Sequence, residues 1–187
     1  MADPVPFLAH EDPDVRRLAI SACAASAADL IEPLGRLLSD DASAAVRAEA
    51  AEALGHAGPG TIPWLDAARN DADAMVVEAV TTAYGEVGDS AAVAWLMTQA
   101  EAGDDRLVRE AAVASLGAIG DERALPTLLA LAAAAPPQVR RRAVVALTAY
   151  DGPEVEAALR DASTDRNPMV REVAALVVGR PERSPGP

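Results

Sequence analysis

Few side chains in this sequence could carry out catalysis or hold a transition metal. Among its 187 residues the chain has two histidines, His10 and His56, and one cysteine, Cys23. Zinc and iron sites need clusters of histidine, cysteine and carboxylate, and the two histidines fall in different parts of the chain. No nucleophile with an adjacent base is apparent, and no glycine-rich phosphate loop is present. The sequence therefore predicts no catalytic residue, no metal and no cofactor, which favours a noncatalytic role.

Carboxylates are abundant and unbalanced. There are 29 acidic residues against 16 arginines and no lysine, and the net charge is −13. This acidity argues against binding to a phosphate backbone, so we expect no nucleic-acid partner. No apolar run is long enough to cross a membrane, and the start of the chain has no signal-peptide pattern. We therefore expect a cytoplasmic protein.

An internal repeat organises the chain. The segment from Val46 to Gly55 recurs from Val108 to Gly117. Weaker copies begin at Val15, Val76, Val139 and Val170, so successive copies lie 31, 30, 32, 31 and 31 residues apart. We number positions from this valine, so that V+4 is the fourth residue after it. Positions V+4 and V+8 are small or apolar in every copy, which predicts one buried stripe along a helix.

A shorter helix is expected before each of the later copies, so that each repeat is a helical hairpin with a first and a second helix. The predicted first helices span residues 32–39, 62–69, 91–101, 124–134 and 154–162. Acidic residues precede most second helices, where they can act as N-caps. Glycines at V+9 are expected to end the second helices in the left-handed conformation; these are Gly55, Gly85, Gly117 and Gly179.

This pattern of Asp, Val-Arg, Ala and Leu-Gly resembles the short HEAT-like repeats of the phycobilisome-lyase type. The resemblance implies an all-α protein, a right-handed α-solenoid of about six HEAT-like helical hairpins, with the second helices on the concave face. It covers one array over residues 1–180, with units near 1–28, 29–58, 59–88, 89–120, 121–150 and 151–180. The proline-rich residues 181–187 are expected to be a disordered tail.

The resemblance also implies that the arginine at V+1 bonds an acid in a neighbouring turn. Val77 replaces this arginine in the third repeat, and Pro136-Pro137 replace the acid in the fifth, so the series should be interrupted there. The segment Val46–Ala50 is similar to the His-Glu repeats of deoxyhypusine hydroxylase. Ala48 stands where that family would place an iron-binding histidine, so its activity is not carried over.

Charge along the array indicates a binding surface. Residues 1–120 carry the whole net charge of −13, and residues 121–187 are neutral. The resemblance places V+2, V+3, V+6 and V+10 on the concave face. The candidate contact residues in these columns are Glu49, Glu52, Glu78, Glu86, Glu110, Arg141 and Arg142. They predict a scaffold or adaptor that binds a protein or peptide with a basic segment in an acidic groove.

Two alternatives remain open at this point. One is a lyase-like enzyme or chaperone for a tetrapyrrole or another small molecule, which the resemblance implies. The other is self-association through Val173 and Leu176 on the last helix. Trp64 and Trp95 occupy matching places in two first helices, and they form either buried packing or an exposed patch.

Overall fold

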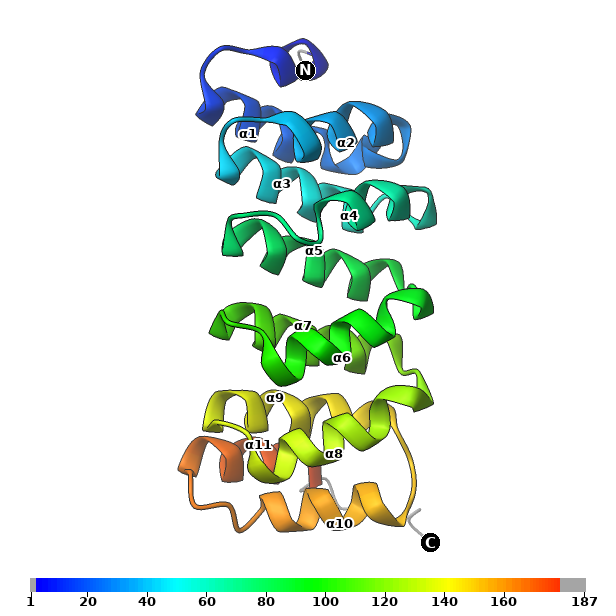
Figure 1. The fold of residues 1–187 in the computed structure, drawn as a ribbon, viewed down its shortest axis with the longest axis vertical. Helices are drawn as coiled ribbons and strands as arrows, with labels where there is room; N and C mark the ends of the chain where they lie inside the picture. Colours follow the sequence, from blue (N-terminus) through cyan, green and yellow to red (C-terminus); the bar gives the residue numbers. More distant parts are fainter. Residues whose placement is uncertain (1–2, 179–187) are drawn as a thin grey trace, which may run out of the picture. The chain divides into compact units, whose positions relative to one another are not determined.

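Alanine-rich segments with an apolar residue at every third or fourth position form the helices of this protein. The structure is a computed structural model that describes residues 3–178, apart from the side chain of residue 25. Over these residues it has eleven α-helices, six short 3-10 helices and no strand. The helices group into two compact units, Met1–Ala92 (unit 1) and Val93–Pro187 (unit 2). The predicted all-α class is therefore confirmed (Figure 1).

Unit 1 contains five α-helices in two layers. The second helices α1, α3 and α5 pack side by side, and the first helices α2 and α4 pack against each other and against the second helices. The bounds are α1 Pro13–Cys23, α2 Ile31–Asp40, α3 Ala44–Gly55, α4 Ile62–Ala68 and α5 Ala74–Val87, with 3-10 segments η1 Val5–Ala9, η2 Ala24–Leu30, η3 Pro59–Thr61 and η4 Ser90–Ala92. The predicted first helices at 32–39 and 62–69 agree with α2 and α4 within one residue at each end.

Unit 2 repeats the same plan with six α-helices. The second helices α7, α9 and α11 form one layer and the first helices α6, α8 and α10 form the other (Figure 1). The bounds are α6 Val93–Ala102, α7 Arg106–Ile119, α8 Leu125–Ala134, α9 Pro137–Ala146, α10 Pro153–Ala162 and α11 Pro168–Val178, with 3-10 segments η5 Glu122–Ala124 and η6 Leu147–Ala149. Within each unit the helical hairpins stack as in an α-solenoid. The prediction of one continuous array over residues 1–180 stays a prediction, and the expected tail at 181–187 lies outside the described residues.

The repeat columns form the core of both units. Every V+4 side chain is buried, from Ala19 in α1 to Ala174 in α11. The V+8 column is buried from Cys23 to Leu147, but Val178 at the end of α11 is 45% exposed. Each hairpin thus covers its apolar stripe with its neighbours, as in other repeat proteins.

Arginines at V+1 tie successive hairpins together. Each of three arginines binds the aspartate ahead of the next second helix through two hydrogen bonds of 2.7–2.8 Å; the pairs are Arg16–Asp41, Arg47–Asp71 and Arg140–Asp165. The third guanidinium nitrogen of each donates to a carbonyl oxygen ahead of its own helix, at His10, Asp41 and Ala135. We call these three pairs the arginine–aspartate ladder.

The ladder is interrupted where the sequence predicts. Val77 in α5 carries no guanidinium, and Arg109 in α7 donates instead to the carbonyl oxygen of Ala100 at 3.3 Å. The boundary between the two units follows the hairpin of Val77 directly. Unit 1 therefore holds two ladder pairs and unit 2 holds one, among the residues that the structure describes.

The prediction for the V+9 glycines is wrong. The left-handed glycines in the described chain are Gly58, Gly88, Gly120 and Gly152, which lie three or more residues beyond V+9. Gly55 and Gly117 are helical, and because they have no side chain, neighbouring second helices can approach each other closely there. A Cβ on Gly117 would lie 2.7 Å from the Cα of Ala146, and a Cβ on Gly55 would lie 3.0 Å from the Cα of Ala83. Gly179 lies outside the described residues.

Candidate functional site

The second helices of unit 1 bring three predicted acidic residues to one surface hollow. This acidic hollow lies between α3 and α5, has a volume of about 210 Å³, and is lined by Glu52, His56, Glu78, Ala79, Thr82, Ala83 and Glu86. The buried Ala79 and Ala83 form its floor. Glutamates at V+2, V+6 and V+10 therefore surround a small depression, as the repeat register predicts.

Two carboxylates of the acidic hollow lack a partner. Glu52 and Glu78 form no hydrogen bond or ion pair with any residue within the described range 3–178. Glu86 pairs with His56, whose Nδ1 lies 2.8 Å from Oε2, and both side chains remain exposed. A basic group from outside would therefore find two unpaired carboxylates and one that is shared with an imidazole.

The electrostatic environment of Glu52 is repulsive. Burial of the carboxyl and the neighbouring charges of Glu49 and Glu78 raise its pKa, while His56 and Arg17 oppose that shift. Burial is the largest of the causes that raise this pKa, and the two like charges add to it, although the side chain remains exposed to solvent. A cation placed between these carboxylates would relieve the repulsion.

Glu49 lies next to the acidic hollow and is partly engaged. The hydroxyl of Ser21 donates to its Oε1 at 2.5 Å, and Nη2 of Arg17 lies 3.6 Å from its Oε2. Its side chain retains 23% exposure. Glu49 thus belongs to the same acidic surface and extends it from α3 toward α1.

In unit 2 the V+6 and V+10 columns of α7 and α9 hold no acid. A hollow of about 220 Å³ lies between α7 and α9, and its lining includes Ala114, Ala118, Val145 and Ala149 at V+6 and V+10. Since alanine and valine fill these positions in unit 2, helix packing does not require glutamate at V+6 and V+10 in unit 1. The acids in unit 1 are therefore free to serve another purpose.

The three remaining candidates lie in unit 2 and differ in their surroundings. Glu110 is 8% exposed, and Nη1 of Arg106 lies 2.5 Å from its Oε1. Arg142 is exposed on the rim of the α7–α9 hollow, with its Nε 3.9 Å from Oε2 of Glu110. Arg141 is half-buried beside it. The sequence pattern did not reveal that Glu110 is buried and already neutralised, because its partner Arg106 precedes the repeat motif.

The other side chains that could do chemistry have structural roles. Cys23 is buried in the V+8 column, and burial raises the pKa of its thiol, which disfavours the nucleophilic thiolate. The hydroxyls of Tyr84 and Tyr150 donate to Asp66 and to backbone carbonyl oxygens, respectively. Nowhere in residues 3–178 do three histidine, cysteine or carboxylate side chains meet as a metal site would need.

Both tryptophans are half-buried, and they belong to different units. Trp64 lies in α4 with its indole against Gly35 of α2, and Trp95 lies in α6 of unit 2. A Cβ on Gly35 would lie 2.1 Å from Cδ2 of Trp64, so the ring packs directly on that helix. Packing within its own unit therefore accounts for Trp64.

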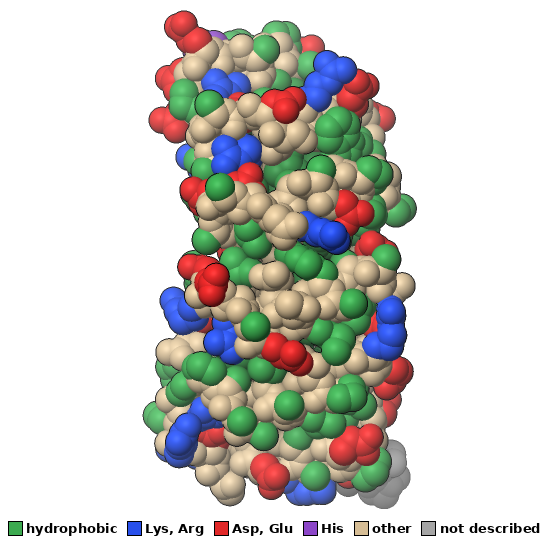
Figure 2. Space-filling model, in the orientation of Figure 1, with side chains coloured by type: hydrophobic (Ala, Val, Ile, Leu, Met, Phe, Trp, Pro, Cys, Tyr) green, Lys and Arg blue, Asp and Glu red, His purple; other side chains and the backbone are tan. Residues whose placement is uncertain are grey.

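The first helices α8 and α10 of unit 2 border a further hollow. Figure 2 shows scattered hydrophobic side chains over these helices, with acidic side chains among them. A hollow of about 440 Å³ between these helices is lined by alanines, Leu129, Glu154, Asp161 and Asp165.

None of the helices in the described range is both long and apolar enough to span a bilayer.

Comparison with known proteins identifies the repeat. A sequence model of HEAT repeats matches residues 3–83 and 61–147. No match to a curated protein was found.

Several solved structures share the fold. The complex of CpcE and CpcF of phycocyanin lyase from Nostoc sp. PCC7120 contains a chain that is 23% identical with a TM-score of 0.72; the match covers 94% of this chain and 74% of that chain. A designed armadillo repeat protein in complex with peptide (KR)4 is 20% identical with a TM-score of 0.61, over 96% and 99%. Human deoxyhypusine hydroxylase is 19% identical with a TM-score of 0.53, over 85% and 76%. At these identities the likeness shows the fold alone.

Proposed function

Because the chain belongs to the HEAT-repeat family, we propose that it is a noncatalytic scaffold that binds a basic segment of a protein or peptide on the second helices of unit 1. The contact residues are Glu49, Glu52, Glu78 and Glu86. The observation that carries the proposal is the pair of carboxylates, Glu52 and Glu78, which both line the acidic hollow and form no hydrogen bond or ion pair with any described residue.

The size of the acidic hollow favours a side chain as its occupant. Its volume of about 210 Å³ is below the range of about 300–1,000 Å³ that small-molecule sites occupy. An arginine or lysine head can enter such a depression while its alkyl stem lies on the alanine floor. A designed armadillo repeat protein of similar fold is complexed with the peptide (KR)4, and a basic peptide on this chain would follow the same principle.

In unit 2, Arg141 and Arg142 are the proposed contacts for a carboxylate of the same partner. Glu110 holds Arg142 in place rather than meeting the partner, because it is buried beneath Arg106 and Arg142. A cytoplasmic location, which the sequence predicts, remains part of this proposal.

The test uses a fluorescein-labelled (Lys-Arg)4 peptide and fluorescence anisotropy at increasing salt. We expect saturable binding that weakens as the salt concentration rises, because exposed charges are screened. Reversal of Glu49, Glu52 and Glu78 to arginine should abolish it. The matched control reverses Glu122, Glu154 and Glu156, three exposed glutamates of unit 2, and changes the net charge equally. If both triple variants lost binding equally, the loss would reflect net charge and not the acidic residues of unit 1. Binding that does not depend on salt would exclude the acidic surface as the binding site.

A further inference from the structure

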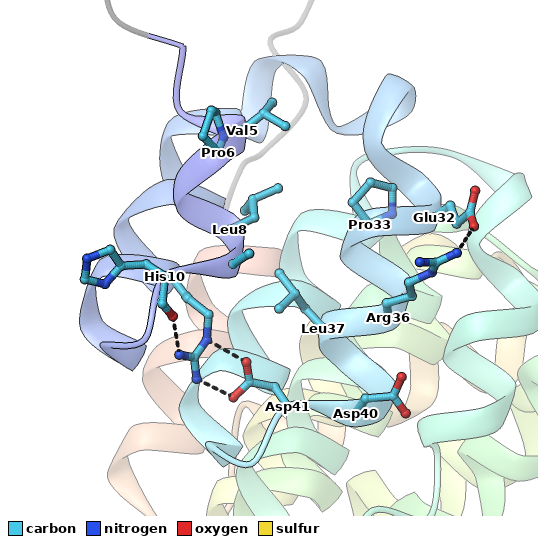
Figure 3. Close-up of a pocket in the computed structure, with 12 residues that line it drawn as sticks. Val5, Pro6, Leu8, His10, Glu32, Pro33, Arg36, Leu37, Asp40 and Asp41 are labelled. Atoms are coloured by element: carbon cyan, nitrogen blue, oxygen red, sulfur yellow. Dashed lines mark hydrogen bonds and ion pairs between the residues drawn. The ribbon is translucent and has the colours of Figure 1, made fainter.

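A large hollow lies at the amino-terminal end of unit 1, away from the acidic hollow. It has a volume of about 740 Å³ and lies between η1 and α2. Figure 3 shows Val5, Pro6 and Leu8 on one side and Pro33, Leu37 and Asp40 on the other. Its lining combines aliphatic side chains with charged ones.

The repeat register explains why this hollow is open. Leu34, Leu65 and Leu128 are fully buried and mark the same position in α2, α4 and α8. The residue just before this leucine faces the preceding first helix. Trp64 packs on Gly35 of α2, and Oγ1 of Thr127 donates to Glu101 of α6 at 2.8 Å.

In α2 the residue at this position is Pro33, and it lines the open hollow. The first repeat has only the five-residue η1 where later repeats have an α-helix of seven to ten residues. Val5 and Phe7 of η1 are 40% and 47% exposed, whereas Leu8 is buried. The side of α2 that would meet a preceding first helix is therefore only partly covered by described residues.

The charges around the hollow indicate the chemistry of its occupant. Arg16 is held by Asp41, and Arg36 is held by Glu32. Asp40 lines the hollow, is exposed, and has no hydrogen bond or ion pair with any described residue. Residues 1–41 contain eight acidic residues and three arginines. An occupant with a basic side chain next to an apolar face would complement this rim.

We propose that this hollow is the seat of an amphipathic helix from a partner protein, which packs on α2 as the first helix of a hairpin and places a basic residue beside Asp40. Apolar side chains of the helix at i, i+3, i+4 and i+7 enter the hollow over Leu37, Pro33 and Leu8. The seat is independent of the acidic hollow, and it recognises a helix rather than an extended basic segment.

The experiment titrates the intact protein with a synthetic amphipathic helical peptide of about 18 residues, a length at which a helix can form. The peptide has leucine at i, i+3, i+4 and i+7 and arginine on the flanks, and a matched peptide has glutamate in place of arginine. Anisotropy gives the affinity, and methyl NMR locates the site. We expect saturable binding with shifts at Val5, Leu8 and Leu37, and binding weaker by about fivefold for the glutamate peptide.

Two variants and two controls decide the outcome. Leu37→Glu should weaken binding at least about tenfold, because a buried leucine contact is lost. Asp40→Arg, a surface change that leaves the fold intact, should weaken it by about fivefold. Leu18→Glu, on an exposed residue of α1 outside the hollow, should leave it unchanged.

The triple reversal of Glu49, Glu52 and Glu78 should also leave helix binding unchanged, so the two proposals can fail separately. Absence of saturable binding, binding insensitive to both Leu37→Glu and Asp40→Arg, or shifts confined to the acidic hollow would overturn the proposal. A dimer in sedimentation that Leu37→Glu dissociates would assign the seat to a second copy of the chain and would overturn it equally.

Discussion

Glu52 shows at the residue scale how the acidic hollow opposes stability. Its pKa is raised by burial and by Glu49 and Glu78, so the folded state favours the protonated form more than the unfolded state does. The charged carboxylate therefore destabilises the fold above its folded-state pKa, and this penalty fades as the pH falls toward the unfolded value of about 4.3.

We expect Glu52→Gln to stabilise the protein at pH 7 by no more than about 0.5 kcal/mol, since solvent screens the exposed side chain. The gain should shrink as the pH approaches 4. Urea unfolding followed by circular dichroism at both pH values measures it. A loss of stability at pH 7 would show that Glu52 is favourably paired in solution, contrary to its surroundings here.

Gly35 is fixed by its contact with Trp64. Alanine is favoured over glycine inside a helix by about 1 kcal/mol, but a Cβ on Gly35 would lie 2.1 Å from the indole. We expect Gly35→Ala to destabilise unit 1 by about 1–3 kcal/mol, as overpacking does. Urea unfolding of Gly35→Ala, Trp64→Leu and the double variant gives the coupling energy. If the double variant is no more stable than the sum of the single changes predicts, the steric explanation fails.

Residue identity predicted which columns are buried, but it did not distinguish two uses of glycine. Gly55 and Gly117 occupy the V+9 column, where glycine was expected to end the helix. In the structure they instead let α3 approach α5 and α7 approach α9. The distance between two helices depends on side chains from both repeats. The sequence of a single repeat therefore could not show which glycines allow close packing between helices and which, like Gly58 and Gly120, adopt positive φ.

The arginine–aspartate ladder is the feature that matters most at the scale of elements. Arg140 is 1% exposed in its pair with Asp165, whereas Arg36 and Glu32 form an exposed pair within α2. Asp165→Asn should cost about 3–5 kcal/mol, because it leaves a buried guanidinium without its counter-charge. Glu32→Gln should change stability by less than about 0.5 kcal/mol. Chemical unfolding of both variants tests this contrast, and similar costs for the two would contradict it.

The ladder also predicts the acid sensitivity of the protein. Hydrogen bonds from Arg47 and Arg140 lower the pKa values of Asp71 and Asp165; at Asp41 burial opposes the shift, and the bonds from Arg16 and Ser43 outweigh it. Groups with lowered folded-state pKa values stabilise the fold above their unfolded pKa of about 3.9, and this contribution is lost as the pH falls through the folded values.

We therefore expect the contribution of the ladder to the unfolding free energy to be constant from about pH 7 to 5 and to fall below about pH 4. Urea titrations between pH 7 and 3 measure this dependence. Asp71→Asn should flatten part of it, since an amide does not titrate. An unchanged pH profile in that variant would mean that other carboxyls cause the acid unfolding.

Helix positions could be predicted closely because the repeat supplies several copies of the same evidence. The five predicted first helices all formed, since the spacing of valine, alanine and leucine constrains each hairpin. The seat beside α2 was not predicted, because it depends on a short 3-10 segment, Val5–Ala9, that shares no pattern with the other repeats. Contact between the acidic hollow and a partner stays a prediction, since a side-chain pattern does not contain the partner.

At the scale of the whole molecule, the two units differ in charge although they share one plan. Unit 1 carries 16 acidic residues and five arginines, and unit 2 carries 13 and 11. The net charges are thus −11 and −2. The V+6 and V+10 columns hold Glu52 and Glu86 in unit 1 and alanine or valine in α7 and α9 of unit 2, whereas the V+4 column is buried in both units. The buried columns thus preserve the hairpin, and the exposed columns vary between the units.

Each unit has its own buried core and its own ladder pairs, so we expect each to unfold with its own midpoint, as cooperative segments of repeat proteins can. The two tryptophans report on them separately, Trp64 on unit 1 and Trp95 on unit 2. In a Trp64→Phe background, Asp165→Asn should lower the urea midpoint that Trp95 reports. In a Trp95→Phe background, the same change should leave the midpoint of Trp64 in place, and Asp71→Asn should lower it. If Asp165→Asn moved both midpoints equally, the chain would unfold as a single cooperative array, and the division of the molecule into two units would have no thermodynamic counterpart.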